Sequence, residues 1–164
     1  MNVKLAMTPH DLHLVVDGTT NTAKMFDYNG LDLYEIPCLP HGVKGPGWTM
    51  QGGDTPPGTY LVGDWVPTLD TDDERTHQEY GVGYYYLIEQ EGQESKEGRA
   101  GVGMHGGGTG LADPMALVQE LLKTLGCIRF HNRDILKLHN SITWIRRTNG
   151  RVFVTVIQAN QAAA

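Results

Sequence analysis

Long hydrophobic runs are missing from this chain of 164 residues. No stretch approaches the roughly 18 consecutive apolar residues that a transmembrane helix needs, so we expect no membrane span. Blocks of basic residues are missing as well, and the formal net charge is −6 at pH 7. A negative surface repels phosphate groups, so the sequence argues against nucleic acid and against an anionic membrane surface as partners.

Cysteine is also scarce, with only Cys38 and Cys127 in the chain. The two could in principle be bridged, but they make no disulfide framework, and we expect two free thiols with Cys38 in the core. None of the histidines, including His10, His13 and His139, belongs to a spaced His/Cys/Asp set that is typical of a metal site. We therefore expect neither a metal nor another cofactor.

Glycine, in contrast, is abundant: 21 residues, concentrated in segments 42–58 and 101–110, accompany eight prolines. This composition predicts a turn-rich, mainly β protein. The length predicts one domain, residues 1–164, with a single core. We expect its strands to form a β-sandwich or a partly closed barrel.

Alternating apolar residues bounded by turn signals predict strands at 12–16, 22–26, 31–37, 59–63, 84–89 and 101–105. The Gly- and Pro-rich segment 42–58 and the polar, acidic segment 68–81 are predicted to be loops. Segments 142–146 and 151–157 are predicted to pair as a hairpin across Asn149-Gly150, because Asn-Gly favours a type I′ turn.

Two helices are predicted, one on each side of Cys127. The first begins at Asp113-Pro114, a capping residue followed by a proline suited to the first helical position, and runs to about Thr124. Its apolar stripe has helical spacing and consists of Leu117, Val118, Leu121 and Leu122. The second helix spans about 132–140, with Asn132 as its cap.

The segment around Cys127 carries the chemistry. Gly126 precedes the cysteine, Arg129 follows two residues later, and His105 lies 22 positions upstream. A cysteine attacks as its thiolate, so it needs a base or a positive charge nearby, which His105 and Arg129 can supply. The glycines after His105 leave room for a substrate backbone. The pattern predicts a nucleophilic cysteine and its base.

These residues resemble the L,D-transpeptidase catalytic domain, the YkuD family, whose pattern is a His-Gly pair, a loop and then Ser-His-Gly-Cys-x-Arg/Asn. His105-Gly106 and the run from Thr124 to Arg129 are similar to it. The Pro-Gly turn at 54–60, the helix at 132–138 and the closing strand at 151–157 extend the similarity over nearly the whole chain.

The resemblance implies a role for each matching residue. Cys127 would be the nucleophile and His105 its base, while the carbonyl of Gly106 would orient the histidine. N–H groups of the Gly126-Cys127 turn would stabilise the oxyanion. Arg129 would bind a substrate carboxylate with two nitrogens, unless it only pairs with a carboxylate such as Asp134.

Four further positions are candidates for contact with substrate. Thr124 stands where the family usually has serine. His131 would share a strand face with Arg129 but is equally suited to the surface. Trp48 would face substrate from the Gly-rich loop or cover a core edge, and one of the tyrosines 84–86 would line the groove.

Leu125 departs from the family, because a second histidine usually occupies its position. An apolar side chain there donates no hydrogen bond and makes a thiolate costlier to form. Peptidoglycan amidase effectors with the same fold also replace this histidine. We therefore expect a slow or specialised enzyme that cleaves rather than crosslinks.

The resemblance also implies a substrate, the stem peptides of peptidoglycan. Three functions stay open: a wall-crosslinking transpeptidase, a wall-degrading peptidase, and a catalytically weak wall-binding or structural module, for example in a phage tail. The start of the chain lacks the pattern of a secretory signal. We therefore expect either that a leader has been removed or that a larger assembly, such as a phage particle or secretion machine, delivers the protein to the periplasm or cell wall.

Overall fold

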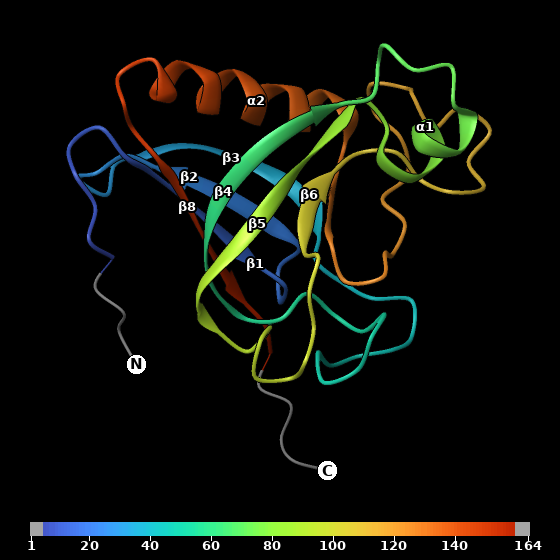
Figure 1. Ribbon diagram of the computed structural model, residues 1–164, viewed down its shortest axis with the longest axis horizontal. Coiled ribbons are helices and arrows are strands. Elements are labelled where there is room, and N and C mark those ends of the chain that lie inside the picture. Colours follow the sequence, from blue (N-terminus) through green and yellow to red (C-terminus); the bar gives the residue numbers. More distant parts are fainter. Residues whose placement is uncertain (1–4, 160–164) are drawn as a thin grey trace.

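Eight strands and two helices make up the computed structural model, which describes residues 5–159 (Figure 1). Residues 1–4, where a leader sequence was considered, lie outside this range. The elements in chain order are β1 Leu12–Asp17, β2 Thr22–Phe26, β3 Asp32–Leu39, β4 Gly58–Pro67, α1 Glu74–Tyr80, β5 Gly83–Gly92, β6 Gly103–His105, β7 Ile128–Phe130, α2 Asn132–Arg146 and β8 Val152–Ile157.

The strands close into one barrel in the order β1-β2-β3-β7-β6-β5-β4-β8. Neighbours pair antiparallel except for β1 with β8 and β6 with β7, which are parallel. The mainly β fold expected from the sequence is therefore confirmed, with full closure in place of a sandwich. Closure gives every strand of the barrel two neighbours over at least part of its length.

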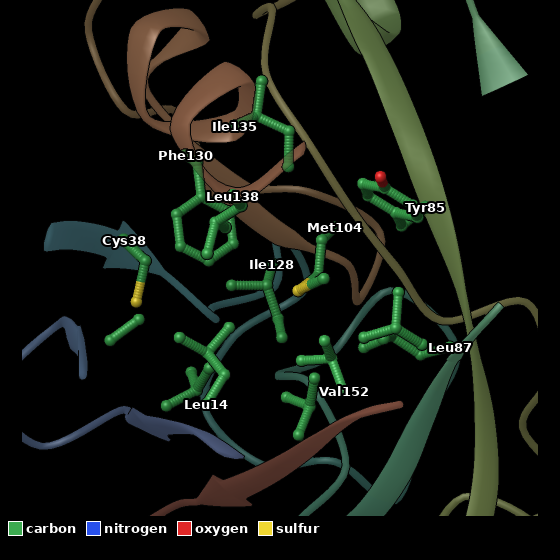
Figure 2. Packing of buried hydrophobic residues seen from close by; sticks show 14 of the residues in the cluster. Leu14, Cys38, Tyr85, Leu87, Met104, Ile128, Phe130, Ile135, Leu138 and Val152 are labelled. Atoms are coloured by element: carbon green, nitrogen blue, oxygen red, sulfur yellow. The ribbon is translucent and has the colours of Figure 1, made fainter. Parts of the chain in front are cut away.

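The core forms because alternate residues of each strand point inward. On β1, Leu14 and Val16 are fully buried while their neighbours are partly exposed, and Met25 on β2 follows the same rule. Figure 2 shows Leu14, Met104 and Ile128 meeting in this interior. Cys38 lies there too, at 1% exposure, as expected.

Helix α2 lies across the top of the barrel in the view of Figure 1 and buries Ile135, Leu138 and Ile142 against it. It continues to Arg146, so the predicted strand at 142–146 is wrong. That segment stays helical because Ile142 extends the buried stripe of Ile135 and Leu138 by one more turn.

The Asn-Gly pair after α2 ends the helix and does not turn a hairpin. Asn149 has a φ of 59°, and the N–H groups of Asn149 and Gly150 donate to the carbonyls of Arg146 and Ile145. A left-handed residue that satisfies the last helical carbonyls is a common helix terminator. The Asn-Gly pair does form a turn, as predicted, but this turn ends helix α2 instead of joining two strands.

The helix predicted at 113–124 is also wrong, because this segment forms turns and bends. Its carbonyls accept hydrogen bonds from donors elsewhere in the fold. Asn132 donates to Pro114 and Ala116, the N–H of Arg133 donates to Leu117, and the Arg129 side chain donates to Leu122. These tertiary bonds replace the helical ones, so local propensity is overridden.

A helix forms instead within 68–81, where a loop was predicted. The Asp73 side chain accepts from the N–H of Arg75 and caps α1, and Arg75 pairs with Glu79 at 3.1 Å one turn later. α1 buries none of its residues. Without an apolar stripe it gives no periodicity signal, so its acidic cap and its i, i+4 pair were the only available clues.

Asn132 joins the segment 113–124 to the rest of the molecule. It is the first residue of α2 and not its cap, a position taken by His131 without a side-chain bond. Its amide nitrogen donates to Pro114 and Ala116, while its oxygen accepts from the N–H of Gly107 at 3.1 Å. Fully buried, this side chain fixes two loops that meet near His105.

Asn132→Ala is therefore expected to lower the free energy of unfolding by about 3 kcal/mol, because it leaves several buried backbone groups without partners. Chemical denaturation of both proteins measures the change. Asn140→Ala, an exposed position of the same helix, is the matched control and should change stability by less than about 0.5 kcal/mol. Equal effects of the two changes would contradict this role of Asn132.

Candidate active site

Parallel pairing of β6 with β7 brings His105, Cys127 and Arg129 together on the wall of one cavity. Met104 pairs with Ile128 and His105 pairs with Arg129. Met104 and Ile128 are fully buried in the core, as Figure 2 shows. Because side chains alternate along a strand, the residues on either side of them point the other way. His105, Cys127 and Arg129 accordingly line one cavity of about 540 Å³.

His105 is held as a neutral imidazole. Its Nδ1 lies 2.9 Å from the carbonyl oxygen of Gly106, which only accepts, and 3.5 Å from Nη1 of Arg129, which only donates. The shorter contact favours the tautomer with the proton on Nδ1. Burial, reinforced by the charge of Arg129, lowers the pKa of His105 to about 3. Nε2 is then left with a lone pair at neutral pH. The orienting carbonyl expected from Gly106 is present.

Tyr80 completes the surroundings of His105. Its ring meets the imidazole edge-on, with centroids 5.2 Å apart, and it also lines the cavity. Tyr84 stacks on Tyr80 at 4.7 Å and bonds to the hydroxyl of Tyr86. Sequence reasoning considered Tyr84 and Tyr86 but missed Tyr80, which ends the helix that it also missed.

Cys127 differs from Cys38 in its access to solvent. It is partly exposed and lines the cavity, with its sulfur 3.7 Å from the carbonyl oxygen of Gly101. Burial raises the pKa of the Cys127 thiol, while the N–H of Gly103 and the charges of Arg129 and Arg99 oppose this rise. For Cys38, burial raises the pKa to about 12. Of the two thiols, Cys127 is the one placed to react.

The turn before Cys127 is held by Thr124. Its hydroxyl donates to the carbonyl of Cys127 at 2.7 Å and accepts the N–H of Gly126 at 3.0 Å. The Gly126 N–H is therefore already bonded, which leaves the main-chain N–H of Cys127 as the candidate from this turn for an oxyanion. Thr124 lines the cavity, as expected, but its hydroxyl serves the turn.

Arg129 is anchored by backbone carbonyls. Nε donates to Leu122 at 3.1 Å, and Nη1 donates to Glu79 at 3.0 Å and to Gly106. Asp134 pairs with Arg133 at 3.5 Å, so the alternative pairing with Arg129 is not formed. Burial lowers the pKa of Arg129 to about 10, which keeps it charged at neutral pH. With Nε and Nη1 engaged, the expected two-nitrogen contact with a carboxylate is not available in this arrangement.

Two sequence candidates lie away from the cavity. His131 caps α2 by its backbone, and its Nδ1 is buried without a partner among the described residues. Trp48 is partly buried, and its carbonyl accepts from Arg99. Neither side chain lines the cavity wall. Leu125 does line it and is 70% exposed, so the departure from the motif faces the entrance.

Within residues 5–159, no helix combines the length and apolar character that crossing a bilayer requires. Over the same range, no cluster of three or more His, Cys, Asp or Glu side chains is arranged to hold a metal ion.

A family model described as the L,D-transpeptidase catalytic domain, YkuD, matches residues 11–154. The chain belongs to this family. The matched range includes His105, Cys127 and Arg129, which line the cavity described above. Comparison with curated proteins gives no match.

Solved structures similar to this family member include Bd1075 of Bdellovibrio bacteriovorus, with a TM-score of 0.61 and 16% identity over 93% of this chain and 48% of that one. The helical cell shape determining protein Pgp2 from Campylobacter jejuni has a TM-score of 0.61 and 18% identity, over 94% and 50%. An L,D-transpeptidase from Stackebrandtia nassauensis has a TM-score of 0.53 and 15% identity, over 99% of this chain and 63% of that one. The likeness shows a shared fold, and this chain spans about half the length of the first two.

The buried, neutral His105 has a consequence for stability. Its folded pKa of about 3 lies below the value of 6.5 for a free histidine, so between these values the unfolded chain binds a proton that the folded chain does not. The free energy of unfolding should therefore decrease as the pH falls from 6.5, by up to about 1.4 kcal/mol per pH unit from this group.

His105→Gln should flatten this dependence between pH 6.5 and 4, measured by denaturation at each pH. His13, whose pKa burial also lowers, serves as the control position: His13→Gln should leave the larger share of the slope in place. An unchanged slope in His105→Gln would show that the imidazole is not held neutral by the fold.

Proposed function

We propose that the protein is a cysteine acyltransferase of the L,D-transpeptidase type that acts on peptidoglycan stem peptides, with Cys127 as nucleophile and His105 as base. The observation that carries this proposal is the 2.9 Å contact between His105 Nδ1 and the carbonyl of Gly106, in the cavity that Cys127 also lines. An imidazole with its proton on Nδ1 presents Nε2 as a proton acceptor.

The reaction follows from these groups. His105 Nε2 takes the thiol proton, and the Cys127 sulfur attacks the carbonyl carbon of the L,D amide bond that joins a diaminopimelate-type third residue to a D-residue. The carbonyl oxygen becomes an oxyanion, for which we assign the main-chain N–H of Cys127 as donor. When the intermediate collapses, the C–N bond breaks and the leaving amine takes the proton from His105.

The thioester then reacts with an acceptor. An amine restores an amide and makes a crosslink, whereas water gives a shortened stem with a free carboxylate. In either case His105 deprotonates the acceptor, and the Cys127 thiol is regenerated. Exposed Leu125 and Val43 give the entrance of the cavity an apolar wall.

Mass analysis of muropeptides after incubation with the purified protein tests the proposal. We expect shortened stems with the wild-type protein, and crosslinked products if an amine is the acceptor. Cys127→Ala should abolish either change, while the matched Cys38→Ala should retain activity if its fold is intact. No change in the muropeptides with wild-type protein would overturn the proposal in favour of a wall-binding or structural module.

The same two cysteines should also differ in their chemical reactivity. Iodoacetamide or a carbapenem should modify Cys127 quickly, because it lies in an open cavity, and leave buried Cys38 unmodified in the folded protein. Peptide mapping after a short exposure measures both sites. Fast modification of Cys38 with an inert Cys127 contradicts the nucleophile assignment.

Leu125→His tests the departure from the family motif. Since Leu125 is 70% exposed at the cavity, the change should leave stability within about 0.5 kcal/mol and add a hydrogen-bond donor beside the nucleophile. We expect turnover or thiol reactivity to rise, toward the ~10²-fold that one such donor contributes. Leu117→His, at a position that is 62% exposed and outside the cavity wall, is the control. If Leu125→His changes neither quantity, the position carries no functional message.

A further inference from the structure

Arg99 is a buried cation held by backbone carbonyls. It lies in the loop between β5 and β6 and is 6% exposed. Nη1 donates to the carbonyls of Trp48, at 3.0 Å, and Asp54, and Nη2 to those of Gly53, at 3.4 Å, and Leu125, at 3.3 Å. Among residues 5–159 it takes part in none of the ion pairs, and its Nε is buried without a partner.

Burying a charge in this way is unfavourable. Carbonyl oxygens satisfy the N–H groups of a guanidinium but do not cancel its charge, and an uncompensated buried cation is strongly destabilising. A neutral amide could join the same loops without that penalty. Burial lowers the pKa of Arg99, while negative charge on Tyr60, Cys127, Glu94 or Asp54 acts against this, so a thiolate at Cys127 adds to the carboxylates that favour the charged guanidinium.

The turn that carries Cys127 lies directly against Arg99. A Cβ atom at Gly126 would come within 1.9 Å of Arg99 Nη2, so the guanidinium occupies the space beside this glycine. Leu125, whose carbonyl Arg99 binds, comes just before Gly126. The carbonyl of Gly101, two residues after Arg99, lies 3.7 Å from the Cys127 sulfur. Arg99 thus contacts the turn before Cys127 from the loop between β5 and β6, whereas Arg129, on β7, lines the same cavity as Cys127.

Of the other ionisable groups around the sulfur, Arg129 also favours a thiolate. His105 is neutral at physiological pH, and Glu94 acts against a thiolate. Burial raises the pKa of the Cys127 thiol, and the charges of Arg129 and Arg99 lower it. The remaining titratable residues that line the cavity or lie near the sulfur are Glu79, Lys123, Tyr80 and Tyr84.

We propose that Arg99 is a positioning residue of the nucleophile: it fixes the turn that ends in Cys127, and its positive charge stabilises the Cys127 thiolate. This rests on Cys127 being the nucleophile of the proposed function. Nothing in the motif pointed to Arg99, which lies just before the Gly-rich segment 101–110 and far from Cys127 in sequence. Its role arises from the three loops that it joins.

Arg99→Lys and Arg99→Gln separate charge from tethering, because both can donate to carbonyls and only the lysine is charged. In a Cys38→Ala background, the rate of iodoacetamide alkylation of Cys127 is measured against pH, with circular dichroism and thermal melting as checks of folding. The midpoint should rise by about one pH unit in Arg99→Gln and by less than half of that in Arg99→Lys. If Arg99→Gln does not fold, Arg99→Met is measured in its place.

Arg146→Met is the matched control, because Arg146 also donates to two carbonyls, those of Val62 and Gly63, but from α2 to β4. It should leave the midpoint unchanged. A folded Arg99→Gln with the wild-type midpoint, or equal shifts in the Lys and Gln variants, would overturn the proposal. Alkylation needs no turnover, so the role of Arg99 is tested even if the muropeptides stay unchanged and the proposed function fails.

Discussion

The short parallel pairing between β6 and β7 is the constraint on which the site depends. It joins two strands of three residues each, which lie far apart in the sequence, and seats Met104 and Ile128 at the centre of the core. Because their outward neighbours must then face the cavity, core packing itself sets the register of His105 against Cys127 and Arg129. A slip of one residue would turn the candidate catalytic side chains into the core.

A second layer of order comes from buried polar side chains. Asn132 and Gln119 bond to backbone groups of the loops around His105 and β7, and Gln119 also accepts the N–H of Asn132. Both are buried and have their hydrogen bonds satisfied by backbone groups. Such networks specify one arrangement, because each partner would be left unpaired in any other. These hydrogen bonds therefore hold the irregular segments of the cavity wall in one conformation, as backbone hydrogen bonds do in a helix.

The electrostatics of the cavity follow one pattern. Arg99 and Arg129 are both buried, and both donate to carbonyls. Both charges lower the pKa of the Cys127 thiol, against burial and the charge of Glu94, while His105 stays neutral. A site of this kind favours negative charge at the sulfur and on any oxyanion next to it, because fixed cations interact strongly where water is excluded.

The sequence alone determined the mainly β class and the strands with clear alternation, and it pointed to the residues for which we propose a role in the chemistry. His105, Gly106, Gly126 and Cys127 were recognisable because a nucleophile needs particular neighbours, and because the motif is local in each half. β4 is longer than predicted: it spans Gly58–Pro67 and not 59–63, because pairing with neighbours extends a strand beyond its apolar pattern.

Only the tertiary structure decided the rest. The Leu-rich segment before Cys127 has a helical pattern, but its carbonyls are bound by Asn132 and Arg129, which a local reading cannot foresee. Tyr80 and Arg99 belong to the site through packing and through contacts between loops. His131 was a candidate because it lies close to the motif, and Trp48 because it lies in a Gly-rich loop. Neither side chain lines the cavity. Sequence spacing fixes which groups are present, whereas the closure of the barrel and its long-range hydrogen bonds fix which of them meet.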